Sequence, residues 1–248
     1  KETIAITAYY LDVSISQGLI RSQLEFKVVS VTCLFLATKV MDSSSTSVTL
    51  EDLIQLCSSQ FSATDIVQME LQILTKLQWR LYPPTPNCFV HQFLRLFPNE
   101  TTPQTLDKVQ QISQLMIEVA TCQPMICSQS LPSEVAYASL LLATEFVGTD
   151  AELSIRNRQI WFLRMSTYCA LKSNHVNVLQ AIKELGNLIS EEQIMTTRIC
   201  EILGDVSAQQ DPRFHTNDKS SVWPNYQQRN KLSPRSPQLF SGLEPLDT

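Results

Sequence analysis

Glycine is scarce in this chain of 248 residues, which has only five. They stand far apart, at Gly18, Gly148, Gly186, Gly204 and Gly242. Phosphate sites of the Rossmann, P-loop and protein-kinase types need clustered glycines, because there the backbone approaches the phosphate closely. The sequence therefore excludes nucleotide sites of these types, and we predict no cofactor.

The chain also lacks a disulfide framework, an apolar run of membrane length and an excess of basic residues. Its seven cysteines are scattered, several within apolar runs, which indicates reduced thiols in an intracellular protein. The longest near-continuous apolar run, residues 28–38, is well short of the roughly 20 residues that span a bilayer. With 19 Lys+Arg against 24 Asp+Glu, the net charge of -5 disfavours extensive contact with nucleic-acid phosphates. We expect neither a membrane nor a direct nucleic-acid partner.

No arrangement of residues indicates catalysis or metal binding. The three histidines lie in no recognisable motif: His91, His175 and His215. Cys122 and Cys127 are spaced C-x4-C, but no second Cys or His pair accompanies them, so a zinc site is not predicted. Paired acids such as Glu51 and Asp52 stand at predicted helix starts, where they complement the helix dipole. We predict no catalytic residue, no metal site and no enzymatic activity.

Proline divides the chain into segments. No proline precedes the cluster at residues 83–86, and none lies between residues 132 and 212. Long proline-free stretches permit helices, and proline clusters end them. We predict an N-terminal domain over residues 1–82, a second over 83–205 and a tail over 206–248. The tail is rich in Gln, Pro, Asn, Ser and Asp, and has too few aliphatic residues to offset the entropy of ordering, so we expect it to be disordered.

Apolar residues recur at helical spacing through both predicted domains. Ile4, Ala8, Leu11 and Ile15 predict a helix that Gly18 closes. Residues 24–41 are apolar on nearly every face, which predicts a central helix surrounded by others. Two further starts have the capping-box pattern, Thr49 with Asp52 and Ser62 with Asp65. Later helices are predicted over residues 87–97, 106–122, 133–147, 155–171 and 191–203. No sustained period of two suggests a sheet, so the predicted fold class is all-α.

Two predicted central helices resemble each other. Residues 32–39, TCLFLATK, align with residues 138–145, ASLLLATE. A repeat of that spacing is the size of a domain, which favours tandem helical domains over a solenoid. A chance match between two buried Leu/Ala-rich helices is the alternative.

Two charges stand at unusual places. Lys39 follows a predicted buried helix, and Glu70 is one polar residue among the apolar neighbours of residues 67–74. Charges flanked by apolar surface are either an internal ion pair or polar anchors within a protein-binding patch. The second repeat has Glu145 at the position of Lys39, so helix packing does not require a lysine there.

At this point the first domain resembles a cyclin box. Three segments carry the resemblance in order and spacing: residues 8–12 (AYYLD), residues 31–39 (VTCLFLATK), and residues 68–79 (QMELQILTKLQW) followed by Pro84-Thr85-Pro86. It covers residues 1–97 well and continues more weakly to about residue 205 as a C-terminal cyclin fold, opened by Leu131-Pro132-Ser133. The resemblance implies two tandem five-helix domains. The first cyclin-box helix, which carries part of the substrate-docking patch and an Arg that pairs with the aspartate matched by Asp12, is absent from this chain.

The resemblance also implies a function and a set of site residues. Cyclins bind a cyclin-dependent Ser/Thr protein kinase and hold it in its active arrangement during the cell cycle, so this chain would be a regulatory subunit found in nucleus and cytoplasm. By matching, Lys39 and Glu70 would bind the kinase backbone. Five residues would form the apolar bed for the kinase C-helix: Leu36, Val40, Leu74, Trp79 and Leu81. Asp12 and Val28 would be structural residues of the box.

Several points stay open in the sequence. Tyr9 to Asp12 and Leu77 to Trp79 resemble D-type cyclins, yet no L-x-C-x-E sequence is present, so the subtype is undecided. Ser233 and Ser236 each precede proline and are candidate phosphorylation sites. Kinase substrates or inhibitors are further expected partners. The alternatives are a transcription factor of the TFIIB kind, which also has two cyclin folds, and a helical scaffold with no kinase partner.

Overall fold

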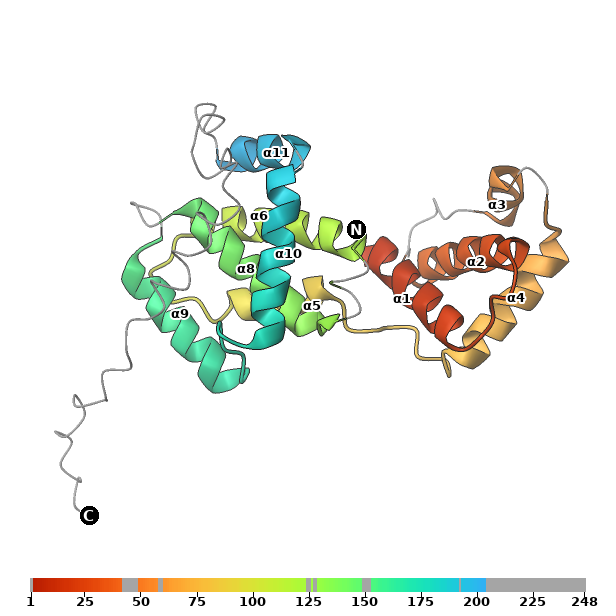
Figure 1. Ribbon diagram of the computed structural model, residues 1–248, viewed down its shortest axis with the longest axis horizontal. Helices are drawn as coiled ribbons and strands as arrows, with labels where there is room; N and C mark the ends of the chain where they lie inside the picture. The colour runs from red at the N-terminus through yellow and green to blue at the C-terminus, as the bar shows by residue number, and fades with distance from the viewer. Residues whose placement is uncertain are drawn as a thin grey trace, which may run out of the picture. The chain divides into compact units, whose positions relative to one another are not determined.

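A computed structural model describes residues 2–41, 49–57, 60–123, 126, 129–148, 153–191 and 193–203 (Figure 1). These residues contain helices and no β-strand, which confirms the all-α prediction. Residues 1–186 belong to one compact unit, and the described residues beyond 186 belong to a second. The domain boundary after residue 82 falls within the first unit and stays a prediction. The predicted tail, with Ser233 and Ser236, lies outside the described residues.

Ten helices lie within the described ranges. They are α1 (Glu2–Ser16), α2 (Gln23–Met41), α3 (Leu50–Leu56), α4 (Ala63–Lys76), α5 (Pro86–Leu94), α6 (Pro103–Thr121), α8 (Pro132–Val147), α9 (Ile155–Tyr168), α10 (Val176–Glu191) and α11 (Gln193–Leu203). None of them is both long enough and apolar enough to cross a membrane.

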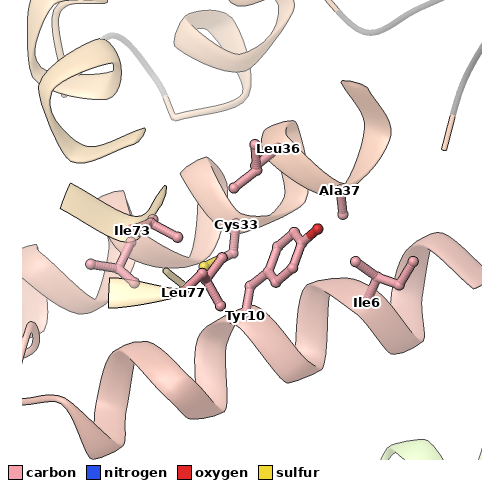
Figure 2. Packing of buried hydrophobic residues seen from close by; sticks show 8 residues of the cluster. Ile6, Tyr10, Cys33, Leu36, Ala37, Ile73 and Leu77 are labelled. Atoms are coloured by element: carbon pink, nitrogen blue, oxygen red, sulfur yellow. The ribbon is translucent and has the colours of Figure 1, made fainter. Parts of the chain in front are cut away.

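Helix α2 is the centre of the N-terminal half. Helices α1, α3 and α4 all pack against it, as its apolar character on nearly every face requires. Val29, Cys33, Leu36 and Ala37 of α2 are buried in one cluster with residues of α1 and with Ile73 of α4 (Figure 2). Each fully buried Val, Leu or Ile side chain contributes about 1.5–3 kcal/mol to folding. This cluster therefore fixes α1 and α4 on α2.

Helix α1 buries a different face from the one that its most apolar spacing suggests. Ile4 and Ile15 are 60% and 49% exposed. The buried residues are Ile6, Tyr10 and Ser14, at intervals of four. Ser14 can be buried because its hydroxyl donates to the Tyr10 carbonyl at 2.7 Å, which satisfies its polar atom within the helix. The packing of α2 thus decides which side of α1 faces the core.

The predicted helix ends are confirmed where the chain supplies local caps. The Ser62 hydroxyl accepts from the Asp65 amide at 3.2 Å, and an Asp65 oxygen accepts from the Ser62 amide at 2.8 Å. Thr49 and Asp52 form the same capping box at α3. Gly18, with φ of +71°, follows the end of α1 in the left-handed conformation.

Helix α8 is the centre of the second half of the first unit. Residues 134–144 of this helix are all buried, and α5 and α6 pack against it. Trp161 of α9 is also fully buried, and its ring stacks on Phe97 with 4.6 Å between centroids. The Trp161 indole N–H donates to the Phe93 carbonyl at 3.0 Å, so its polar atom is satisfied. The two similar sequence segments, 32–39 and 138–145, both lie in central buried helices.

Helix α10 is absent from the sequence prediction, which leaves residues 172–190 without a helix. Its buried residues are nonetheless spaced by one helical turn or less: Val178, Ala181, Ile182, Leu185 and Ile189. This period of three to four residues is the signal that predicts an amphipathic helix. His175 stands just before the first residue of α10.

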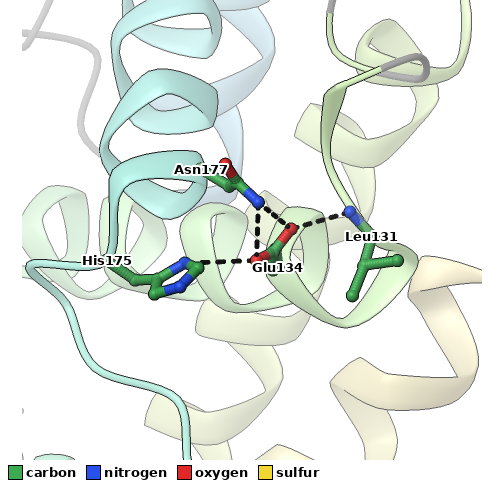
Figure 3. Close-up of polar contacts among 4 residues, drawn as sticks. All are labelled: Leu131, Glu134, His175 and Asn177. Atoms are coloured by element: carbon green, nitrogen blue, oxygen red, sulfur yellow. Dashed lines mark hydrogen bonds and ion pairs between the residues drawn. The ribbon is translucent and has the colours of Figure 1, made fainter.

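A buried carboxylate joins the starts of α8 and α10 (Figure 3). The Glu134 side chain is 5% exposed and accepts from the Leu131 amide at 2.8 Å. The Asn177 amide donates to both Glu134 oxygens, at 3.1 and 3.2 Å. His175 Nδ1 lies 3.2 Å from Glu134 Oε1. Since an unpaired buried charge is costly, these partners are what permit Glu134 to be buried.

The capping box of α4 makes a testable contribution to stability. Hydrogen bonds from the Ser62 hydroxyl and amide lower the pKa of Asp65. A lowered folded-state pKa stabilises the fold above the ordinary Asp pKa of about 4, and this contribution is lost as pH falls through the folded-state pKa. We expect Asp65→Asn to melt at a lower temperature than the unmodified chain at pH 7, with the difference shrinking below about pH 4.

The matched control is Glu51→Gln, an exposed acid in the first turn of α3 that is not part of the capping box. Its melting temperature relative to the unmodified chain should change less with pH. A difference for Asp65→Asn that is equally large in acid would show that the ionised carboxylate does not support the cap.

Candidate protein-binding surface

The structure brings Lys39 and Glu70 together. Lys39 stands in the last turn of α2, and its Nζ lies 2.5 Å from Oε1 of Glu70 on α4. The two side chains are 46% and 13% exposed, and Lys39 Nζ also lies 4.8 Å from the centroid of the Phe35 ring. The two charges therefore form an ion pair within the chain, and this pair lies at the protein surface.

This ion pair keeps hydrogen-bonding capacity for a partner. An ammonium has three N–H donors and a carboxylate about four acceptor sites, so one mutual bond leaves most of both sets available. Exposed ion pairs contribute about 0–1 kcal/mol to folding. Lys39 and Glu70 can thus bind each other and, at the same time, hydrogen-bond to a partner protein.

The corresponding position of the second half has the opposite charge. Glu145, near the end of α8, forms an ion pair with Arg158 of α9, whose side chain is 10% exposed. Both central helices therefore end beside an ion pair with a neighbouring helix. Because either sign is accommodated there, packing of the central helix does not require Lys39.

The predicted apolar bed is only partly at the surface. Val40, Leu74 and Leu81 are half-buried and pack against the core cluster of α2. Trp79 is 64% exposed. Leu36 differs from the expectation: it is 3% exposed, inside the cluster, because α1 and α4 cover its side of α2. It supports the surface from below and offers a partner little area.

Trp79 is exposed because the backbone turns sharply after α4. Gln78 and Trp79 have φ of 51° and 60°, in the left-handed region. That conformation costs an L-residue other than glycine about 1–2 kcal/mol. The Trp79 amide donates back to the Leu74 carbonyl at 3.1 Å, which closes the end of the helix. The strained turn therefore ends α4 and presents the indole to solvent.

The structure adds two residues that the sequence analysis did not single out. Val67 and Leu71 of α4 are 52% and 60% exposed. Val67 lies three residues before Glu70 and four before Leu71, and Leu74 lies three residues after Leu71 and four after Glu70, so the four side chains are neighbours on one helix face. We call Val67, Glu70, Leu71 and Leu74 the α4 stripe. Ile66 and Ile73 mark the buried side of α4, and Val67 and Leu71 are apolar residues outside that side. Apolar residues outside the buried side of a helix are the signal in the sequence that could have revealed them.

The two predicted structural residues differ in environment. Val28 is 7% exposed and packs with Leu53, Phe61 and Ile66, so it joins α2 to α3 and α4. The Asp12 carboxylate lines a cavity of about 140 Å³ beside Ala8 and Tyr9, and desolvation raises its pKa. Within the described ranges it has no hydrogen-bond or ion-pair partner. The structural role expected for Asp12 stays a prediction.

Known proteins resemble this chain over part of its length. Residues 1–82 match the family model described as "Cyclin, N-terminal domain". Cyclin-B2-2 of Oryza sativa subsp. indica is 32% identical over 144 residues, which are 57% of this chain and 32% of that protein. G1/S-specific cyclin-D1 of Danio rerio is 31% identical over 136 residues, which are 53% of this chain and 44% of that protein. The chain thus spans less than half the length of these relatives.

Among solved structures, a viral cyclin from herpesvirus saimiri matches with a TM-score of 0.44 and 15% identity, over 74% of this chain and 83% of that one.

The described residues define a helical protein whose first half presents an ion pair beside exposed apolar side chains, which is the character of a protein-binding module. Together with the family match over residues 1–82 and the named relatives, this shows that residues 1–82 resemble the N-terminal domain of cyclins and that the chain is similar to proteins of the cyclin family. The relatives named here include B-type and D-type cyclins, so they do not single out the D-type subtype.

The ion pair should contribute little to folding. We expect the double variant Lys39→Ala/Glu70→Ala to lose no more than about 1 kcal/mol of unfolding free energy, because Lys39 is nearly half exposed and both partners are removed together. Urea denaturation followed by circular dichroism measures this. A loss of about 3 kcal/mol, as for a broken buried pair, would assign the two charges to the fold.

Proposed function

We propose that this chain is a regulatory subunit that binds and activates a cyclin-dependent Ser/Thr protein kinase in cell-cycle control. The observation that carries the proposal is the Lys39–Glu70 ion pair, which lies beside exposed apolar side chains of α4 inside a cyclin N-terminal domain. A large apolar side chain such as Trp79 at the end of that helix supports it.

The surface has the composition of a binding hot spot. Tryptophan is among the residues that dominate binding free energy, and it does so where a rim excludes water. Here Trp79 and Leu71 offer apolar area, while Lys39 and Glu70 offer donors and acceptors to a partner's backbone. Such a surface suits an amphipathic helix whose apolar face meets α4 and whose end presents free backbone groups to the ion pair.

Activation requires no chemistry of this chain. A subunit that binds the active conformer of a kinase more tightly than the inactive one shifts the population toward the active conformer. A hundredfold difference in affinity corresponds to about 2.7 kcal/mol of coupling. The contribution of this chain is that difference in binding free energy.

The finer assignments follow the same proposal. Residues 83–205 form the C-terminal cyclin fold, supported by the shared central position of α2 and α8. The complex acts in nucleus and cytoplasm, and kinase substrates or inhibitors are further partners.

The Lys39→Ala/Glu70→Ala variant tests the proposed anchors. We expect affinity for the kinase to fall by about 30-fold or more, since the loss of a hot-spot residue costs about 2 kcal/mol or more. The kinase is first identified by co-purification from lysate, and affinity and stimulated phosphorylation are then measured with purified components.

The matched control is Lys183→Ala/Glu184→Ala, which removes one charge of each sign from α10. It should bind and stimulate the kinase like the unmodified chain. Undiminished stimulation by the Lys39/Glu70 variant would contradict the assignment of these residues, and recovery of partners that include no kinase would contradict the function.

Replacing Trp79 should separate binding from stability. Because its side chain is 64% exposed, we expect Trp79→Ala to unfold within about 0.5 kcal/mol of the unmodified chain. Affinity for the kinase should fall about 30-fold, as for a hot-spot tryptophan. Tyr168→Ala, which removes an aromatic side chain that is 73% exposed at the end of α9, is the control that should retain affinity.

A further inference from the structure

Tyr10 makes a long-range hydrogen bond from inside the core. Its side chain is fully buried between α1 and α2 (Figure 2), and its hydroxyl donates to the Leu81 carbonyl at 2.6 Å, across 71 positions of sequence. Burial raises the pKa of Tyr10 to about 12, so the hydroxyl keeps its proton at neutral pH. A phenylalanine would fill the same space, and only the hydroxyl reaches the segment that follows α4.

That segment carries Trp79 of the proposed kinase surface and a second exposed aromatic residue, Tyr82. It begins at the left-handed Gln78 and Trp79, and Tyr82 within it is 76% exposed. Two of its amides donate to carbonyls at the end of α4. The Trp79 amide donates to Leu74, and the Arg80 amide donates to the Leu77 carbonyl at 3.0 Å.

Helix α1 holds this segment at two points. The first is the Tyr10 bond to Leu81. The second is the Thr85 hydroxyl, which donates to Glu2 Oε2 at 2.7 Å. Residues 80–85 form no regular secondary structure. Leu81 packs on the core cluster, while Trp79 and Tyr82 are exposed to solvent. A strained backbone persists only where its surroundings hold it, and the Tyr10 bond is a contact that does so two residues after Trp79.

We infer that Tyr10 is a positioning residue for the kinase-binding surface: its hydroxyl, through the Leu81 carbonyl, holds Trp79 and Tyr82 in the orientation that a partner meets. The inference rests on the proposed function. Its physical basis is preorganisation, because a segment already ordered before binding loses less conformational entropy when the complex forms. Tyr10 itself touches no partner.

Tyr10→Phe removes the hydroxyl and keeps the ring. We expect hydrogen exchange at the Trp79 and Arg80 amides to rise about tenfold, and kinase affinity to fall about tenfold, the usual scale for one lost hydrogen bond. Tyr9→Phe is the matched control: it is the neighbouring tyrosine of α1, 40% exposed, and its hydroxyl makes no hydrogen bond within the described part of the chain. It should leave exchange and affinity unchanged.

A double-mutant cycle distinguishes positioning from general stability. If Tyr10 acts through Trp79, Tyr10→Phe should lower affinity much less in a Trp79→Ala background than in the unmodified chain. An equal loss in both backgrounds would overturn the inference, as would unchanged exchange at Trp79 and Arg80 in Tyr10→Phe.

The exchange measurement does not depend on the kinase, so it also separates the two proposals. An unmodified chain that binds no kinase would overturn the proposed function and with it the role of Tyr10 in binding. Should Tyr10→Phe fail to fold, hydrogen exchange in the unmodified chain still tests the inference. Unprotected Trp79 and Arg80 amides would show that the segment is not held, and the inference would be wrong.

Discussion

The burial of α2 is the constraint on which the N-terminal half depends. A helix that is apolar on nearly every face must be covered from several sides, and α1, α3 and α4 supply that cover. Their packing places Glu70 of α4 opposite the last turn of α2, where Lys39 stands. It also carries Tyr10 to within hydrogen-bonding distance of the Leu81 carbonyl. The geometry of the candidate surface is thus a consequence of core packing.

The second half meets the same constraint without the same surface. Helix α8 is buried by its neighbours as α2 is, but the charge near its end, Glu145, pairs with Arg158. In the first half the turn at Gln78 and Trp79 is strained, which costs stability, and it exposes an indole to solvent. The strained turn therefore does not add to the free energy of folding, and the Lys39–Glu70 ion pair contributes little to it. Both features therefore support the proposed role in binding a partner.

Much of the fold was predictable from local patterns. Capping boxes such as Ser62 with Asp65 are recognisable because both partners lie within four residues. The unusual placement of Lys39 and Glu70 was recognisable because each is a charge among apolar neighbours. Helix α10 has the apolar spacing of an amphipathic helix, so the signal that predicts it is present in the sequence itself.

The sequence by itself determined the helical class, most helix ends and the family resemblance, because spacing, caps and ordered motifs are local properties. Only the tertiary structure decided which sides of the helices are covered, and hence which residues can meet a partner. It buries Leu36 and exposes Val67, Leu71 and Ile4. It also joins Tyr10 to Leu81. Helical periodicity specifies a face but not its neighbour, and a contact across 71 positions exists only once the helices have packed.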